Sequence, residues 1–132
     1  MIYDFRSFPL ESLHGLAFGA SKAAECAARQ GRFWPMHDRL FAAQQQLAEK
    51  DLLANAGALQ LETPKFQACL NTATAQVQAD LSDGQRLGVT ATPSFMIAVN
   101  QHNNSVKVLY RLTGMQTLQQ LTSAVASAEG RT

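Results

Sequence analysis

Of the 132 residues (14.3 kDa), 46% are hydrophobic and 16% are charged, which is the composition of an ordinary globular domain. The formal net charge is +1 and the basic residues are scattered, which excludes the basic surface that nucleic acids or anionic membranes require. No apolar run approaches the roughly 20 residues of a membrane-spanning helix. We therefore expect one domain over residues 1–132, without a nucleic-acid or membrane partner.

The first elements in the chain are predicted to be a strand and a long helix. Residues 2–8 alternate aromatic and polar side chains, which is typical of a strand, and Pro9 ends it. From Ser12 the apolar residues follow the helical period, and Gly31 is placed to end that helix. The apolar stripe of this helix is mostly alanine, so we expect it to pack closely against its neighbours. The predicted stripe consists of Leu13, Leu16, Ala17, Ala20, Ala23, Ala24 and Ala27.

Four more helices are expected before residue 88. The third of these has an N-terminal signal, with Thr63 as the cap and Pro64 at the first helical position. The second of the four helices spans residues 51–61, and the fourth runs from about 74 to 87. The third is short and places Phe66, Cys69 and Leu70 together. The first carries on one side Phe33, Met36, His37, Leu40, Phe41 and Leu47.

The pattern changes after residue 88. Ser94–Asn100 is an apolar strand, "QHNN" is a turn, and residues 106–112 form a second strand, so an antiparallel hairpin is predicted. A helix over 114–128 closes the chain. Strands at both ends with helices between them indicate an α/β or α+β fold with a small sheet. The predicted inward residues of the last helix are Met115, Leu118, Leu121, Val125 and Ala128.

Pro93 lies directly before the first predicted hairpin strand, in "LGVTATPSFMI". Proline removes a backbone donor and is confined to strand starts, edges and bulges. The Thr92–Pro93 bond is one for which the cis form costs little. By itself, this dipeptide indicates a trans proline that opens an edge strand.

Two separate motifs resemble the DsbA-like thiol–disulfide oxidoreductases of the thioredoxin superfamily. The first is "FPLESLHGLAFGASKAAECAARQGRFWPMHDRLF", and the second is "LGVTATPSF", in which Ala91 replaces the family's second glycine. The resemblance covers nearly the whole chain. It implies an α/β, thioredoxin-like fold with a helical insertion over about 12–87 and a small mixed sheet.

The resemblance also implies a candidate binding site. In the family, the residue matching Pro93 is a cis-proline that faces the redox site, and the residue matching Thr92 offers its backbone to an extended peptide. We therefore expect Ala91, Thr92 and Pro93 to form a peptide-binding loop.

The sequence departs from the family at the redox motif, because it contains no Cys-x-x-Cys. The resemblance implies that the family's first strand and redox helix are absent, so no catalytic residue is assigned. The leading hypothesis is a non-catalytic remnant or a peptide- or protein-binding module. Two enzymatic alternatives remain: a disulfide oxidoreductase whose redox segment is truncated or supplied by a partner, and a glutathione-dependent isomerase or transferase.

Cys26 and Cys69 lie on different predicted helices. They could act as a redox pair, form a structural disulfide, or pack as two thiols. Relatives in the resembled family carry cysteines at both places outside their active site, which favours a structural role. The histidines have no partners at metal-site spacing, and we expect neither a metal nor another cofactor.

Loss of a central strand should leave unpaired strand edges and uncovered apolar surface, both of which promote association. We therefore expect a homodimer that forms through the incomplete sheet. The first ten residues are acidic, aromatic and proline-containing, so we do not expect them to be a signal peptide. The expected location is cytoplasmic if the chain is complete, and periplasmic if it is a fragment of an exported protein.

Overall fold

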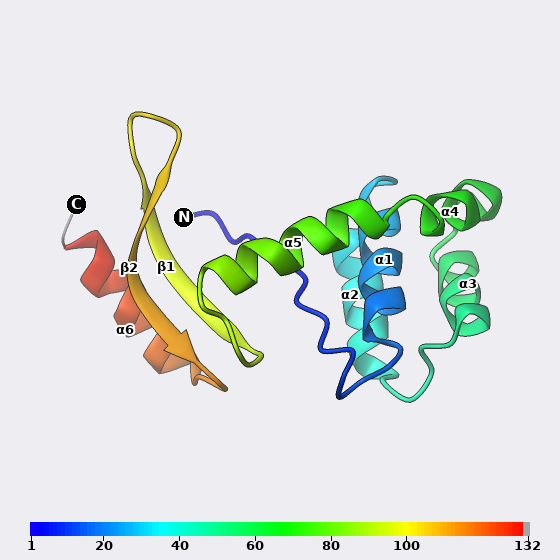
Figure 1. The fold of residues 1–132 in the computed structure, drawn as a ribbon, viewed down its shortest axis with the longest axis horizontal. Helices are drawn as coiled ribbons and strands as arrows, with labels where there is room; N and C mark the ends of the chain where they lie inside the picture. The colour runs from blue at the N-terminus through cyan, green and yellow to red at the C-terminus, as the bar shows by residue number, and fades with distance from the viewer. Residues whose placement is uncertain (131–132) are drawn as a thin grey trace. The chain divides into compact units, whose positions relative to one another are not determined.

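Six helices and a two-stranded sheet make up residues 1–130, the part of the chain that this computed structural model describes (Figure 1). The chain separates into two compact units, Met1–Leu87 and Gly88–Thr132. The fold is mixed α/β and consistent with an incomplete thioredoxin fold, which confirms the predicted class. The expected helical insertion ends where the first unit ends, and the single domain over 1–132 stays a prediction. The elements are α1 (Ala17–Ala28), α2 (Phe33–Ala42), α3 (Glu49–Ala58), α4 (Thr63–Leu70), α5 (Thr74–Arg86), β1 (Ser94–Asn100), β2 (Val106–Thr113) and α6 (Leu118–Glu129).

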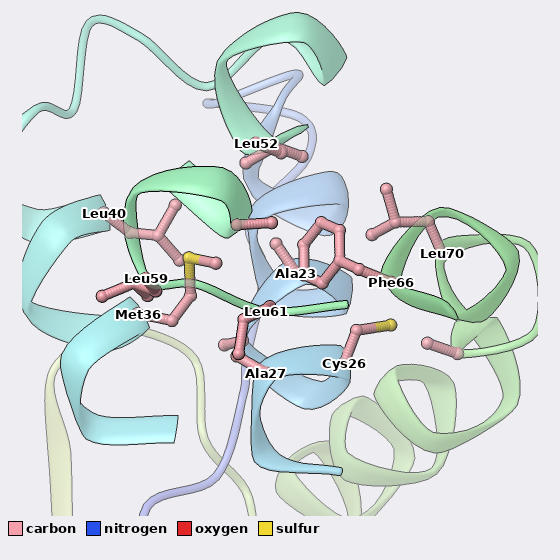
Figure 2. Packing of buried hydrophobic residues seen from close by; sticks show 13 residues of the cluster. Ala23, Cys26, Ala27, Met36, Leu40, Leu52, Leu59, Leu61, Phe66 and Leu70 are labelled. Carbon is pink, nitrogen blue, oxygen red and sulfur yellow. The ribbon is translucent and has the colours of Figure 1, made fainter. Parts of the chain in front are cut away.

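The core of the first unit is built around α1, which packs against α2, α3, α4 and α5. Its buried face is mostly alanine, and small side chains let neighbouring helices approach closely. Gly31 ends this helix as predicted, with a φ of 73° and with the Arg32 N–H donating to the carbonyl of Ala27 at 2.8 Å. Figure 2 shows the core side chains gathered around α1; they include Ala23, Cys26, Ala27, Met36, Leu40, Leu52, Leu59, Leu61, Phe66 and Leu70.

The strand predicted over residues 2–8 is wrong. This segment has no regular secondary structure, and β1 and β2 are the strands of the described chain. A strand needs a neighbour for its backbone hydrogen bonds, and the alternating pattern cannot supply one. The aromatic residues instead pack on α2: the rings of Tyr3 and Trp34 stack at 5.5 Å, and Phe5 lies edge-on to His37 at 4.9 Å.

The same N-terminal segment also contacts α5. The Arg6 guanidinium lies 3.3 Å from the Asp80 carboxylate, and the Ser7 N–H donates to that carboxylate at 3.4 Å. The hydrogen bond from Arg6 to Asp4 is the main cause that raises the pKa of Arg6 above its ordinary value. The segment is therefore held to α5 by polar contacts.

Two helices begin later than predicted. The helix expected from Ser12 begins at Ala17, so that Leu13 and Leu16 are exposed rather than inward. Pro9 is buried, and the Leu13 and His14 N–H groups donate to the Leu10 carbonyl, which makes the intervening residues a turn.

The last helix begins at Leu118 rather than at residue 114. Thr117 caps it: the Gln120 N–H donates to the Thr117 hydroxyl at 3.1 Å, and the Thr117 N–H donates to the Gln120 side chain at 2.7 Å. Met115 lies before this cap and is 89% exposed, and Leu118 is 77% exposed, so neither points inward as predicted. Ala128 is buried, as expected.

The helix α4 is shifted by one residue from its prediction. Glu62 occupies the cap position, so Thr63 and Pro64 stand at the first and second helical positions. The Glu62 N–H donates to the Gln30 side chain at 2.9 Å. Gln30, which lies just beyond the end of α1, therefore accepts the hydrogen bond of the N–H group at the cap of α4.

In the second unit, β1 and β2 form the predicted antiparallel hairpin. Ser94 pairs with Thr113 and Asn100 pairs with Val106, with an irregularity between Ile97 and Ala98. The helix α6 packs against both strands. The sheet of the described residues is thus wholly antiparallel, rather than the small mixed sheet that was expected, because the segment over 2–8 does not join it.

Candidate functional site

The loop that leads into β1 carries the predicted peptide-binding residues. It begins at Gly88, whose φ of +78° favours glycine, and it ends with a Thr92–Pro93 peptide bond that is cis. Ala91, Thr92 and Pro93 are all exposed. The three residues thus lie together directly before the start of β1.

Two hydrogen bonds fix this loop to the hairpin. The Gly114 N–H, just after β2, donates to the Pro93 carbonyl at 2.8 Å, and the Ser94 hydroxyl donates to the Ala91 carbonyl at 2.6 Å. Both bonds use carbonyl groups that flank Thr92. The loop is therefore held on each side of Thr92.

Thr92 itself makes no hydrogen bond within residues 1–130, either through its backbone N–H and carbonyl or through its hydroxyl. An exposed residue whose backbone N–H and carbonyl are both unpaired can exchange hydrogen bonds with an added strand, which is how extended peptides bind at strand edges. Within the second unit, β2 pairs with one side of β1, and no strand formed by residues 88–130 pairs with the other side. The geometry therefore suits an extended segment that runs past Thr92.

A shallow hollow lies beside this loop. Its polar lining comes from Gly88, Thr90, Ser94, Arg111 and Thr113, and its apolar lining includes Phe95 and Met96. Sequence reasoning missed Arg111. The signal that could have found it is the hairpin register, because Arg111 pairs with Met96, three residues after Pro93.

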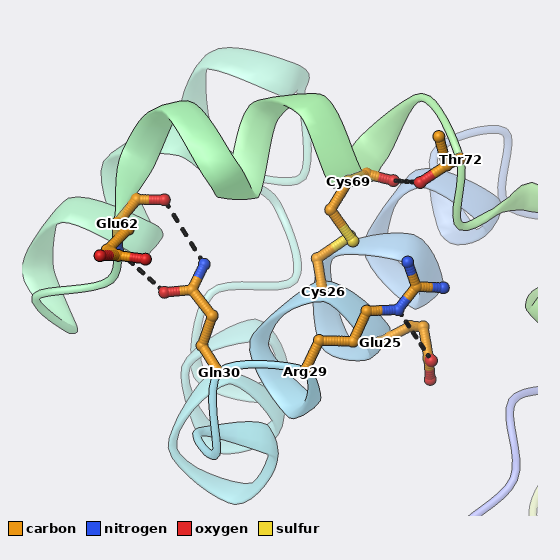
Figure 3. The surroundings of a disulfide bond; sticks show 7 residues. All are labelled: Glu25, Cys26, Arg29, Gln30, Glu62, Cys69 and Thr72. Carbon is orange, nitrogen blue, oxygen red and sulfur yellow. Dashed lines mark hydrogen bonds and ion pairs between the residues drawn. A yellow bond between two sulfur atoms is a disulfide. The ribbon is translucent and has the colours of Figure 1, made fainter.

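The second pair of predicted residues, Cys26 and Cys69, forms a disulfide with a Cα–Cα distance of 5.8 Å (Figure 3). It joins α1 to α4, and the side chain of Gln30 joins the same two helices through the backbone of Glu62. Cys26 lies in the last turn of α1 and Cys69 in the last turn of α4. Redox-active cysteines are typically found at helix N-termini, where the helix stabilises a thiolate, so this placement fits a structural bond.

The described residues hold no group of three or more His, Cys, Asp or Glu side chains that could bind a metal ion. His37, which the sequence placed on an apolar helix face, lies between aromatic rings and its Nδ1 is 3.0 Å from the Asp38 carboxylate. Among residues 1–130, no helix combines the length and apolar character needed to cross a membrane.

Comparison with known families gives a match over most of the chain. Residues 2–112 match the family described as thioredoxin. This range includes most of both compact units and ends near the end of β2.

Similar proteins of known name are much longer than this chain. The chain is 34% identical over 128 residues to the Na(+)/H(+) antiporter NhaA 3 of Salinispora tropica, which covers 96% of this chain and 18% of that protein. It is 33% identical over 106 residues to the Na(+)/H(+) antiporter NhaA 1 of Mycolicibacterium gilvum, covering 77% of this chain and 17% of the relative. For the Na(+)/H(+) antiporter NhaA of Herminiimonas arsenicoxydans, the identity is 36% over 80 residues, or 59% of this chain and 13% of the relative.

The chain thus spans less than a fifth of the length of these relatives. No solved structure matches it.

Proposed function

The chain belongs to the thioredoxin family, and from this premise we propose that it is a non-catalytic domain that binds an extended peptide or protein segment at residues 91–93. The observation that carries the proposal is the unpaired backbone of Thr92, which is exposed between two fixed carbonyl groups. A bound segment would exchange hydrogen bonds with Thr92 as an added strand does.

The state of the cysteines supports a binding role over a redox role. The sequence has two cysteines, and both are used in the disulfide between α1 and α4. Reduction of a substrate disulfide requires a thiolate that attacks it. Neither cysteine is free to supply one in this structure.

The proposal is tested with a peptide whose backbone donors are blocked selectively. An extended peptide of about ten residues is N-methylated on every second residue, and a second version is methylated on the alternate set. Because the backbone groups of a strand face its neighbour only at alternate residues, we expect one version to lose binding and the other to retain it.

Binding is measured by fluorescence anisotropy, and the amide signals of Ala91 and Thr92 are followed by NMR. Equal loss of binding with both methylated peptides, or shifts confined to the first unit, would contradict the proposal.

A second candidate function is that of a thiol–disulfide oxidoreductase whose Cys-x-x-Cys lies outside this sequence. The observation that favours it is the small share of the relatives that the chain spans, 13–18% in the three comparisons above. In that arrangement the loop around Thr92 would hold the substrate peptide while another segment supplies the thiolate.

Insulin reduction separates the two candidates. The polypeptide purified from its native source, with its mass determined, is compared with the 132-residue chain. Turnover by the native polypeptide alone supports the second candidate. Turnover by the 132-residue chain that the double variant Cys26→Ala/Cys69→Ala abolishes would contradict both, because Cys26 and Cys69 would then be the redox pair.

A further inference from the structure

The hollow beside the peptide-binding loop contains a cation with no anionic partner. Arg111 lies on β2 and is exposed, and it forms no ion pair with any residue in 1–130. An unpaired guanidinium is a ready donor for a carboxylate, which it can hold through two parallel hydrogen bonds.

The guanidinium of Arg111 lies next to Gly88. A Cβ atom at position 88 would lie 3.3 Å from Nη1 of Arg111, so the guanidinium rests against the Gly88 backbone at the start of the loop. The positive φ of Gly88 disfavours a side chain there for a second reason. The cation is thereby placed next to the loop that ends in Thr92 and Pro93.

The charge balance of the second unit favours an acidic ligand. Between residues 88 and 130 the sequence has two cations, Lys107 and Arg111, and one carboxylate, Glu129. The remaining polar groups that line the hollow, on Thr90, Ser94 and Thr113, are neutral. Nothing on the lining of the hollow therefore repels a carboxylate.

We propose that Arg111 makes the loop selective for extended peptides that carry an acidic side chain. This inference rests on the proposed peptide-binding function and names the ligand class for the same site. The acidic side chain would reach Arg111 while the peptide backbone pairs with Thr92. Since Arg111 is exposed, the pairing should be modest in strength and weakened by salt.

The test uses a neutral ten-residue peptide of Thr, Val and Ser, and versions with one Glu or one Gln placed in turn at each position. We expect one Glu position to bind up to about fivefold more tightly than the matched Gln peptide at low salt. The preference should disappear in Arg111→Gln, persist in reduced form in Arg111→Lys, and persist fully in Lys107→Gln, which removes the same charge elsewhere on β2.

Each other outcome overturns a definite claim. If Glu and Gln peptides bind equally to the unmodified chain, the selectivity is refuted and the binding function stands. If Lys107→Gln removes the preference as fully as Arg111→Gln, the selectivity comes from net charge rather than from the hollow, and the inference is wrong. If no peptide binds at any position, the proposed function fails and the inference fails with it. Circular dichroism of each variant confirms that the fold is retained.

Discussion

Cys26 is buried on α1, and the disulfide to Cys69 closes a loop over a sequence separation of 43 residues. A crosslink stabilises the folded state chiefly by restricting the unfolded chain, and a loop of this length corresponds to about 4 kcal/mol in the chain-entropy model. We predict that reduction lowers the free energy of unfolding by up to this amount, as measured by urea unfolding with and without dithiothreitol.

The control for this prediction is the double variant Cys26→Ala/Cys69→Ala. It should be as unstable as the reduced chain and should show no further response to dithiothreitol. Equal stability of the oxidised and reduced chains would contradict a structural role for the bond. Alanine is preferred to serine here because a hydroxyl at the buried position 26 would need a hydrogen-bond partner.

At the scale of elements, the contact of the N-terminal segment with α5 depends on the absence of a side chain at Gly84. A Cβ at this position would lie 2.5 Å and 2.6 Å from two ring carbons of Phe8. We predict that Gly84→Ala destabilises the fold by about 1–3 kcal/mol, because the Phe8 ring must move. Thermal unfolding measures the change.

A matched glycine on another helix separates this contact from helix propensity. Gly57 lies on α3 with nothing within 4 Å of a Cβ, so Gly57→Ala should be stabilising by about 0.5–1 kcal/mol. If both substitutions stabilise the chain, the contact between position 84 and the Phe8 ring does not affect the free energy of unfolding. Restored stability when Gly84→Ala is combined with Phe8→Ala would assign the cost to the ring.

At the scale of the whole molecule, we propose that the chain forms a homodimer. The chain exposes large apolar side chains, among them Leu13, Trp34 and Phe41. The strand β1 carries no charged residue, whereas β2 carries Lys107 and Arg111. Charges on an edge strand deter pairing with another chain, so the free edge of β1 is where a second copy would pair, in competition with the peptide proposed for the same edge.

Light scattering at micromolar concentration should therefore report twice the 14.3 kDa mass of one chain. An obligate interface of this kind should bury more than roughly 2,000 Å² in total. Ala98→Lys, which adds a charge to an exposed position of β1, should shift the chain toward monomer, and Val106→Lys on β2 should not. A mass of 14.3 kDa for the unmodified chain would disprove the dimer.

The sequence by itself determined the features that depend on local pattern. The apolar run of "SFMIAVN" predicted β1 at its observed bounds, Ser94–Asn100, because its short length and the turn residues on both sides favour a strand over a helix. The alanine stripe likewise predicted the buried face of α1 from Ala23 to Ala27. A Thr-x-x-Gln signal at Thr117 was also present and would have corrected the start of α6.

Only the tertiary structure decided what depends on a distant partner. Residues 2–8 have a strand-like pattern but pack on α2 and α5 and pair with no strand of the described chain. The structure joins Cys26 and Cys69 in a disulfide, which rules out two separate packed thiols, because the ends of α1 and α4 are brought within bonding distance. Arg111 acquired its place beside the loop through the pairing of β2 with β1. Periodicity records which side of an element is apolar, whereas the identity of the neighbour is set by long-range packing, which local sequence does not contain.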